Sequence, residues 1–108
     1  MIVAFSLSPS GGAPAGDLDP DAHGDSVHAA VAAAVRVVRD SGLPNRTSSM
    51  FTEIEGEWDE VMAVVKEAAE AVGAFGSRVS LVLKADIRPG RTGELTGKVE
   101  RLERALDA

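Results

Sequence analysis

The stretch IVAFSLS at residues 2–8 decides the fold, because large apolar residues occupy every second position along it. These residues are Val3, Phe5 and Leu7, and the positions between them hold alanine or serine. A period of two is that of a β-strand with unlike faces. We therefore expect a strand over 2–8 that buries the large residues on one face and turns the small ones the other way.

The same alternation returns near the C-terminus and predicts a second long strand over 79–88. Its apolar set should also pack beneath the helices: Val79, Leu81, Leu83, Ala85 and Ile87. Residues 45–55, which are rich in Ser and Thr, are interpreted as two short strands joined by a turn and ended by Gly56. The sequence thus predicts four strands.

Helical spacing of apolar residues predicts two long helices and a short one. The first begins at Asp25 or Ser26 and stops before Gly42, and the second covers 57–72. Trp58 starts the apolar stripe of the second helix and is expected to anchor the core. A short terminal helix follows over 98–106. Residues 9–24, rich in Gly, Pro and Asp, predict a flexible surface loop.

This element order predicts an α+β fold of the ferredoxin-like, split βαβ type (βαββαβ) in one domain over residues 1–108. Such a fold has a four-stranded antiparallel sheet, two helices on one of its faces and, here, a short C-terminal helix. The other face would carry small and mixed residues. A half-apolar open face of this kind usually packs against another subunit.

Composition excludes several classes of function. The formal charge of -6 disfavours nucleic acid as a partner, and the absence of Cys excludes disulfides and thiolate metal sites. No apolar run approaches the roughly 20 residues that span a membrane, and no signal peptide is evident, so we expect a cytoplasmic protein. The two histidines, His23 and His28, face a predicted loop, so we expect no metal site, no catalytic residues and no enzyme.

Two residues suggest binding, and each has a second interpretation. Phe51 would share a face with Ser49 and Glu53 in an extended segment, where it could hold a flat cationic ring or form part of an interface strand. Asp86 would share a face with Lys84, and the two could form an ion pair, or Asp86 could contact a ligand.

The loop that follows the last predicted strand offers a weaker possibility. Arg88, Arg91 and the neighbouring glycine amides could meet a phosphate group of a small ligand, or they could simply form a surface turn. The spacing of glycines over 93–98 does not match a phosphate loop of the Walker type.

Three segments together resemble one family: IVAFSLSP at 2–9, SMFTEIEGEWDEV at 49–61 and VSLVLKADIR at 79–88. They are similar to the small thiamine-binding protein family of bacteria and archaea, over nearly the whole chain. The resemblance implies a ferredoxin-like fold, assembly through the sheets into dimers and tetramers (a dimer of dimers), and binding of thiamine or its hydroxymethylpyrimidine part without catalysis or a cofactor. Phe51 and Asn45 depart from the Gly and Tyr that the family often has.

A thiamine site should supply hydroxyl groups, an aromatic or methionine wall and a carboxylate. The residues expected to provide them are Ser6, Ser8, Ser49, Phe51, Thr52 and Asp86. The alternative function is a structural or regulatory homo-oligomer without a thiamine site. An acylphosphatase-like enzyme is disfavoured, because the loop after the first strand has no Arg or Lys before Arg36.

Overall fold

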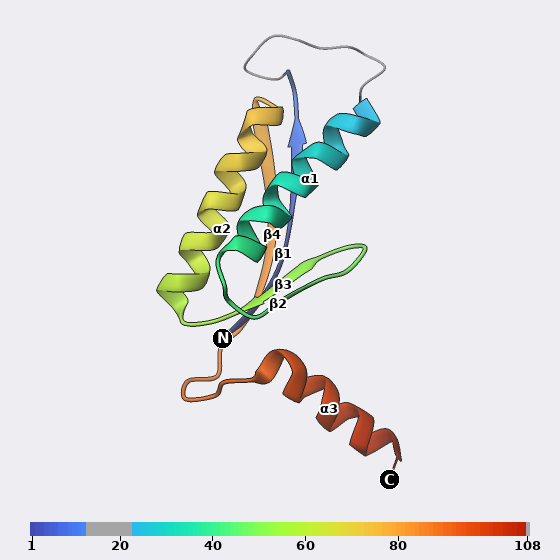
Figure 1. Ribbon diagram of the computed structural model, residues 1–108, viewed down its shortest axis with the longest axis vertical. Coiled ribbons are helices and arrows are strands. Elements are labelled where there is room, and N and C mark those ends of the chain that lie inside the picture. The colour runs from blue at the N-terminus through green and yellow to red at the C-terminus, as the bar shows by residue number, and fades with distance from the viewer. Residues whose placement is uncertain (13–22, 108) are drawn as a thin grey trace.

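The computed structural model describes residues 1–12 and 23–107, and for residues 23–27 only the backbone (Figure 1). The elements follow the order β1 (Ile2–Ser10), α1 (His23–Asp40), β2 (Asn45–Thr47), β3 (Thr52–Glu55), α2 (Trp58–Val72), the 3-10 turn η2 (Gly73–Phe75), β4 (Arg78–Asp86) and α3 (Glu94–Asp107). The predicted order is confirmed. Of the loop predicted over 9–24, the first two residues belong to β1, α1 begins at His23, and residues 13–22 lie outside the described residues.

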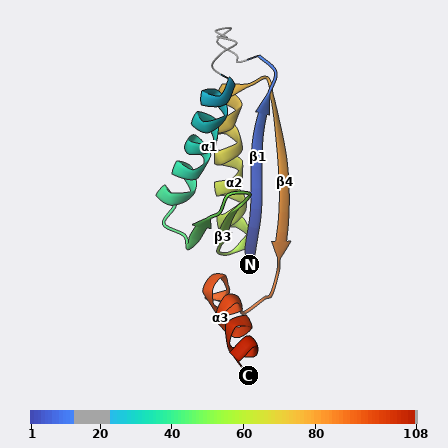
Figure 2. The same ribbon diagram turned by 90° about the vertical axis from the view of Figure 1, so that its right-hand side faces the viewer.

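The four strands form one antiparallel sheet in the order β2-β3-β1-β4. Strand β1 pairs with β4 along its whole length, from Ile2 opposite Asp86 to Ser10 opposite Arg78. It pairs with β3 only from Ile2 to Phe5. Helices α1 and α2 cover the same face of the sheet, as Figure 2 shows, so the predicted α+β ferredoxin-like architecture is confirmed.

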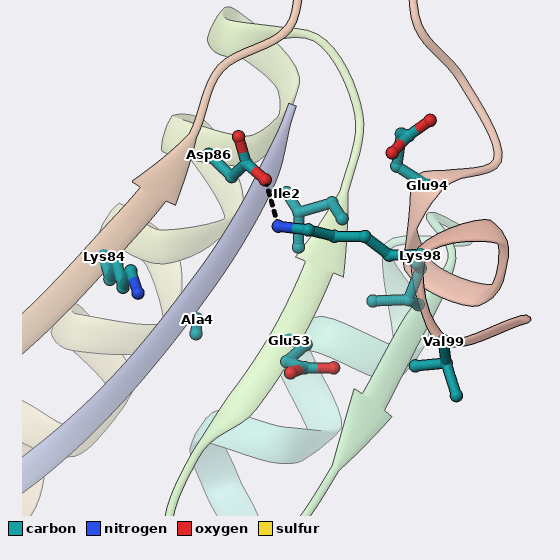
Figure 3. Close-up of a pocket in the computed structure, with 9 residues that line it drawn as sticks. Ile2, Ala4, Glu53, Lys84, Asp86, Glu94, Lys98 and Val99 are labelled. Atoms are coloured by element: carbon teal, nitrogen blue, oxygen red, sulfur yellow. Dashed lines mark hydrogen bonds and ion pairs between the residues drawn. The ribbon is translucent and has the colours of Figure 1, made fainter. Parts of the chain in front are cut away.

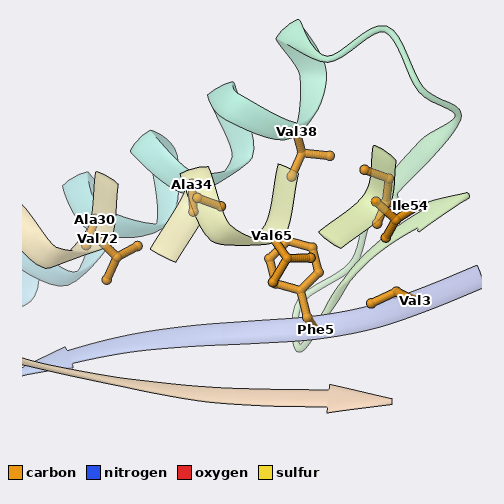
Figure 4. Close-up of a cluster of buried hydrophobic side chains, with 10 residues drawn as sticks. Val3, Phe5, Ala30, Ala34, Val38, Ile54, Val65 and Val72 are labelled. Carbon is orange, nitrogen blue, oxygen red and sulfur yellow. The ribbon is translucent and has the colours of Figure 1, made fainter. Parts of the chain in front are cut away.

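The core lies between this face and the two helices (Figure 4). Val3 and Phe5 of β1 and Ile54 of β3 are buried there, as the alternation predicted. They meet buried side chains of α1 and α2: Ala30, Ala34, Val38, Val61, Val65, Ala68 and Val72. Removing these apolar side chains from water is the main favourable contribution to the stability of such a fold.

Three residues predicted for the core are exposed. Trp58 is 54% exposed, because the stripe of α2 is buried only from Val61 onward. Leu81 is 46% exposed, since β4 is an edge strand and has a neighbouring strand on one side only. Ile87 follows the last residue of β4 and lies outside the sheet, also exposed. The predictions that Trp58 anchors the core and that Leu81 and Ile87 pack beneath the helices are therefore wrong.

The terminal helix is longer than predicted. It begins at Glu94, four residues before the expected start, and it extends from the end of the sheet away from the two-layer body (Figure 1). Gly93 has a positive φ of 69°, which favours glycine and redirects the chain into the helix. No helix within the described residues is long and apolar enough to cross a membrane.

The contact between Gly76 and β1 gives a test of the packing. A Cβ added at Gly76 would lie 2.6 Å from the carbonyl oxygen of Ser10, which is backbone and cannot move aside cheaply. We therefore expect Gly76→Ala to lower the free energy of unfolding by about 1–3 kcal/mol in urea titrations.

Gly73→Ala is the matched control. Gly73 has a helical φ of -60°, and a Cβ there would meet only the Val79 side chain, at 4.0 Å. Its effect should stay within about 0.5 kcal/mol of zero or be slightly stabilising. Equal losses in the two variants would contradict the close approach of Gly76 to β1.

Candidate ligand-binding site

The connection between β2 and β3 is a tight turn. The backbone N–H of Ser48 donates to the carbonyl oxygen of Phe51 at 2.9 Å, and the N–H of Phe51 donates to the Ser48 hydroxyl at 3.3 Å. The two-strand interpretation of residues 45–55 is confirmed. Phe51 is part of this turn and not of an extended segment, so the prediction that it shares a strand face with Ser49 and Glu53 is wrong.

This turn forms one wall of a cavity of about 120 Å³, which we call the hairpin pocket. The other walls come from α1 and from β1, just beyond Phe5, where the pairing of β1 with β3 ends. The lining residues are Phe5, Ser6, Leu7, Val31, Ala34, Val35, Thr47, Ser48, Ser49, Met50, Phe51 and Thr52. The structure therefore brings together Ser6, Ser49, Phe51 and Thr52, four of the predicted site residues.

The lining of the hairpin pocket combines apolar walls with hydroxyl groups. Val31, Met50 and Phe51 are all accessible, and Met50 is 73% exposed. Serine and threonine residues of the turn and of the adjoining ends of β2 and β3 supply donors and acceptors. None of the described lining residues carries a charge. Such a surface suits a flat, neutral ring that makes hydrogen bonds at its edge.

Asp86 does not join this group, because it lies on the open face of the sheet. It lines a second cavity of about 190 Å³, the open-face pocket, with Ile2, Ala4, Glu53, Lys84, Glu94, Leu95, Lys98 and Val99 (Figure 3). Ser8, also on the open face, is exposed and belongs to the lining of neither pocket. The six predicted residues therefore do not converge on one site.

The partner of Asp86 also differs from the prediction. The ammonium group of Lys98, on α3, donates to Asp86, so the ion pair is made by Lys98 and not by Lys84. This hydrogen bond holds the pKa of Asp86 below its usual value of 3.8. Sequence spacing could not reveal the contact, because it depends on where α3 lies.

Two buried glutamates that the sequence analysis missed hold α3 against the sheet. The carboxylate of Glu55, 6% exposed, accepts hydrogen bonds from the N–H groups of Glu94 at 2.7 Å and Leu95 at 3.3 Å. Glu94 in turn accepts from Arg101 at 2.6 Å and forms an ion pair with Arg88 at 3.9 Å. A carboxylate at a helix N-terminus satisfies unpaired N–H groups and is favoured by the helix dipole.

These two glutamates already bind the groups that could otherwise have bound a phosphate. Arg88 already faces Glu94, and the N-terminus of α3 already faces Glu55. No local pattern in the sequence marks this arrangement, since Glu55 and Glu94 are 39 residues apart. The described residues include no group of His, Asp or Glu that could hold a metal ion, and His28 is exposed on α1.

Comparison with known proteins identifies the family. A family model described as "Thiamine-binding protein" matches residues 17–103. The chain belongs to the thiamine-binding protein family. The matched range contains the hairpin turn, β4 and the first ten residues of α3. The resemblance seen in the sequence is therefore confirmed, and the family is named for binding, with no catalytic activity indicated.

Relatives and solved structures agree with this membership. The chain is 51% identical over 107 residues to the UPF0045 protein Mb1933 of Mycobacterium bovis, covering 98% of this chain and 94% of that protein. A UPF0045 protein of Synechocystis is 38% identical over 85 residues, which cover 78% of this chain and 70% of that protein. These two proteins match most of the chain, so membership of the thiamine-binding protein family does not rest on an isolated segment.

Two solved structures share the fold. A Bacillus cereus domain of unknown function, DUF77, superposes with a TM-score of 0.67 and 30% identity, covering 87% of this chain and 83% of that one. A Thermotoga maritima protein, named for thiamine biosynthesis or salvage, superposes with a TM-score of 0.68 and 24% identity, covering 93% and 97%. The fold of the thiamine-binding protein family therefore extends over both layers of this chain.

Attachment of α3 should depend on pH, because its polar contacts use carboxylates. Arg101 lowers the pKa of Glu94 below 4.5, and Lys98 lowers that of Asp86 below 3.8. A lowered pKa in the folded state stabilises the contact above the ordinary pKa, and this stabilisation is lost as the pH falls through the lowered value. NMR shifts of the α3 amides should therefore move toward coil values as the pH falls below these ordinary values, before those of β1 do.

The control for this titration is Arg104→Gln. The structure gives the exposed Arg104 no ion pair with a described residue, so the variant should leave the titration of α3 unchanged. If α3 keeps its helical shifts at low pH for as long as the sheet does, the carboxylates do not hold it.

Proposed function

We propose that this protein binds thiamine, or its hydroxymethylpyrimidine part, in the hairpin pocket as a non-catalytic homo-oligomer. The observation that carries the proposal is the convergence of Ser6, Ser49, Phe51 and Thr52 on one cavity in a chain of the thiamine-binding protein family. The name of the Thermotoga maritima protein points the same way. The lack of cysteine fits the reducing cytoplasm as the place of action.

The chemistry of the pocket favours one end of thiamine. The aminopyrimidine ring is flat and uncharged, and its edge offers both donors and acceptors, so it matches an aromatic wall lined by hydroxyl groups. The thiazolium ring carries a positive charge. When such a ring leaves water, a carboxylate or an aromatic face must compensate that charge. The described lining contains no carboxylate, so the pyrimidine end should enter the pocket and the thiazolium end should remain toward solvent.

The open face of the sheet supports assembly of copies. Glu53 and Lys84 flank Ala4 in one row across three strands, and the structure gives neither an ion pair with another described residue. A second copy turned about an axis parallel to β1 would bring each Glu53 opposite the Lys84 of the other copy. Opposite charges on facing surfaces favour such self-complementary contacts. This would provide one of the two interfaces of a dimer of dimers.

One observation favours the alternative of a structural or regulatory oligomer without a thiamine site. The carboxylate expected to match the thiamine cation, Asp86, faces Lys98 on the other side of the sheet. A chain that had lost the ability to bind the ligand would keep the fold and the assembly surfaces, but it would bind neither thiamine nor the pyrimidine.

Calorimetric titration with hydroxymethylpyrimidine and with thiamine tests the proposal. We expect saturable binding that weakens about tenfold or more in Thr52→Val and in Phe51→Ala, which corresponds to about 1.4 kcal/mol. Thr52→Val keeps the shape of a nearly buried side chain while it removes the hydroxyl group. Phe51 is part of an exposed turn, so its loss should spare the fold.

Asp86→Asn is the matched control, because Asp86 lies on the opposite face of the sheet. Binding in this variant should equal that of the unmodified protein. Loss of binding in Asp86→Asn, with Thr52→Val unaffected, would move the site to the open-face pocket. Absence of heat with both compounds, from a folded oligomer, would favour the structural alternative.

A further inference from the structure

The open-face pocket is the larger of the two cavities described above, and the thiamine proposal leaves it without a function. Its volume is about 190 Å³. Sites for drug-sized ligands measure roughly 300–1,000 Å³, so this pocket suits a smaller molecule. Its floor is the open face of β1, β3 and β4, and the first turns of α3 form its wall (Figure 3).

Three of the five charged residues that line this pocket already have a partner within the chain. The ammonium group of Lys98 donates to Asp86, and the carboxylate of Glu94 accepts from Arg101. Opposite charges that are paired in this way compensate each other. These three residues therefore call for no charge on a ligand.

Glu53 and Lys84 are the other two charged lining residues, and the structure gives neither an ion pair with another residue that it describes. They flank Ala4, which lies opposite Glu53 of β3 on one side and Lys84 of β4 on the other. The single methyl group of Ala4 leaves the space between the two charges open (Figure 3). A ligand in this space should carry one positive and one negative group.

The spacing of Glu53 and Lys84 suits a ligand whose two charges are close together. Adjacent strands lie about 4.8 Å apart, so the two side chains leave the sheet about 10 Å apart. An α-amino acid holds its ammonium nitrogen about 3 Å from its carboxylate oxygens, and a charge-assisted hydrogen bond at each end adds about 2.8 Å. Such a molecule can bridge Glu53 and Lys84 above Ala4.

We propose that the open-face pocket binds a free α-amino acid with a short aliphatic side chain, whose ammonium group pairs with Glu53 and whose carboxylate pairs with Lys84. The aliphatic side chain would contact the apolar part of the lining, which Ile2, Leu95 and Val99 provide. Val99 is 42% exposed, and covering apolar surface of this kind favours binding. This inference goes beyond the thiamine site, which lies on the other face of the sheet.

Other small charged molecules match the pocket less well. A dicarboxylate would bring a negative group to Glu53, and a diamine would bring a positive group to Lys84, so both meet repulsion. A ligand with a single charge pairs with one of the two residues and partly desolvates the other without compensation. A zwitterion pairs with both.

Helix α3 holds the wall of the pocket in place before a ligand arrives. Its first N–H groups donate to the buried carboxylate of Glu55, and Lys98 extends from the next turn to Asp86 (Figure 3). Leu95 and Val99 lie on the same part of the helix. A site whose walls are already fixed loses less conformational entropy when it binds, so its affinity is higher.

The site also links the ligand to assembly. Glu53 and Lys84 are the groups that the proposed stacking of open faces would pair between copies. An amino acid that pairs with both within one copy removes this charge complementarity. Excess valine should therefore lower the mass that sedimentation measures.

NMR titration of the isotope-labelled protein with L-valine and L-leucine tests the proposal. We expect saturable shifts of the amides of Ala4, Glu53, Lys84 and Val99, and none in the turn between β2 and β3. Glu53→Gln and Lys84→Gln should each weaken binding about tenfold or more, because each removes one ion pair. Neither side chain is buried, so both variants should fold.

Two analogues of valine test the need for both charges. Isovalerate lacks the ammonium group, and isobutylamine lacks the carboxylate, while both keep the branched aliphatic part. Each should bind the unmodified protein about tenfold or more weakly than valine does. Binding of either analogue as tight as that of valine would overturn the zwitterion site.

Arg46→Gln is the matched control. Arg46 lies opposite Glu53 in the same cross-strand row, but it belongs to β2 and does not line the pocket. The affinity of this variant for valine should stay within about twofold of that of the unmodified protein. Equal weakening in Arg46→Gln and Lys84→Gln would overturn the assignment of the carboxylate to Lys84.

The amino-acid site and the thiamine site can fail independently, because thiamine should shift the amides of the turn between β2 and β3. Absence of saturable shifts with both amino acids would overturn this inference, whatever the titrations with thiamine show. Binding of valine that leaves the sedimentation mass unchanged would confirm the amino-acid site and overturn the proposed stacking through Glu53 and Lys84.

Discussion

The pairing of β1 with two neighbours of unequal length is the constraint on which the rest of the structure depends. Strand β4 follows β1 along nine residues, while β3 follows it only from Ile2 to Phe5. Where β3 stops, the chain turns through Ser48–Phe51, and the space between this turn, β1 and α1 becomes the hairpin pocket. A β3 as long as β1 would replace that space with a continuous sheet. The short strand thus creates the hairpin pocket.

The sequence predicted the parts of the fold that depend on local periodicity. Alternation identified β1 and β4 because a strand with one buried face repeats every two residues, and the helical stripe of α2 was equally clear. The alternation in β1 also predicted correctly that Val3 and Phe5 face the helices. These features follow from neighbouring residues and require no knowledge of how distant elements meet.

The errors arose where burial depends on the neighbours of a whole element. Leu81 has the alternation of a core residue, yet β4 is an edge strand, and strand order cannot be derived from alternation. Phe51 does not have the phase of an extended segment, because the turn between β2 and β3 covers residues 48–51. Asp86 and Glu55 find partners on α3, a helix that the chain reaches only after β4. Contacts across such distances leave no spacing pattern.

The hairpin pocket and the exposed β4 edge of the sheet lie on opposite sides of β1. The hairpin pocket lies at the β3 side of β1, whereas β4 occupies the other side of β1. Stacking of the open faces, as proposed above, would leave α1 and the helix-covered wall of the pocket exposed. Such stacking would stabilise a chain whose aliphatic core holds few aromatics, and it would not cover the hairpin pocket.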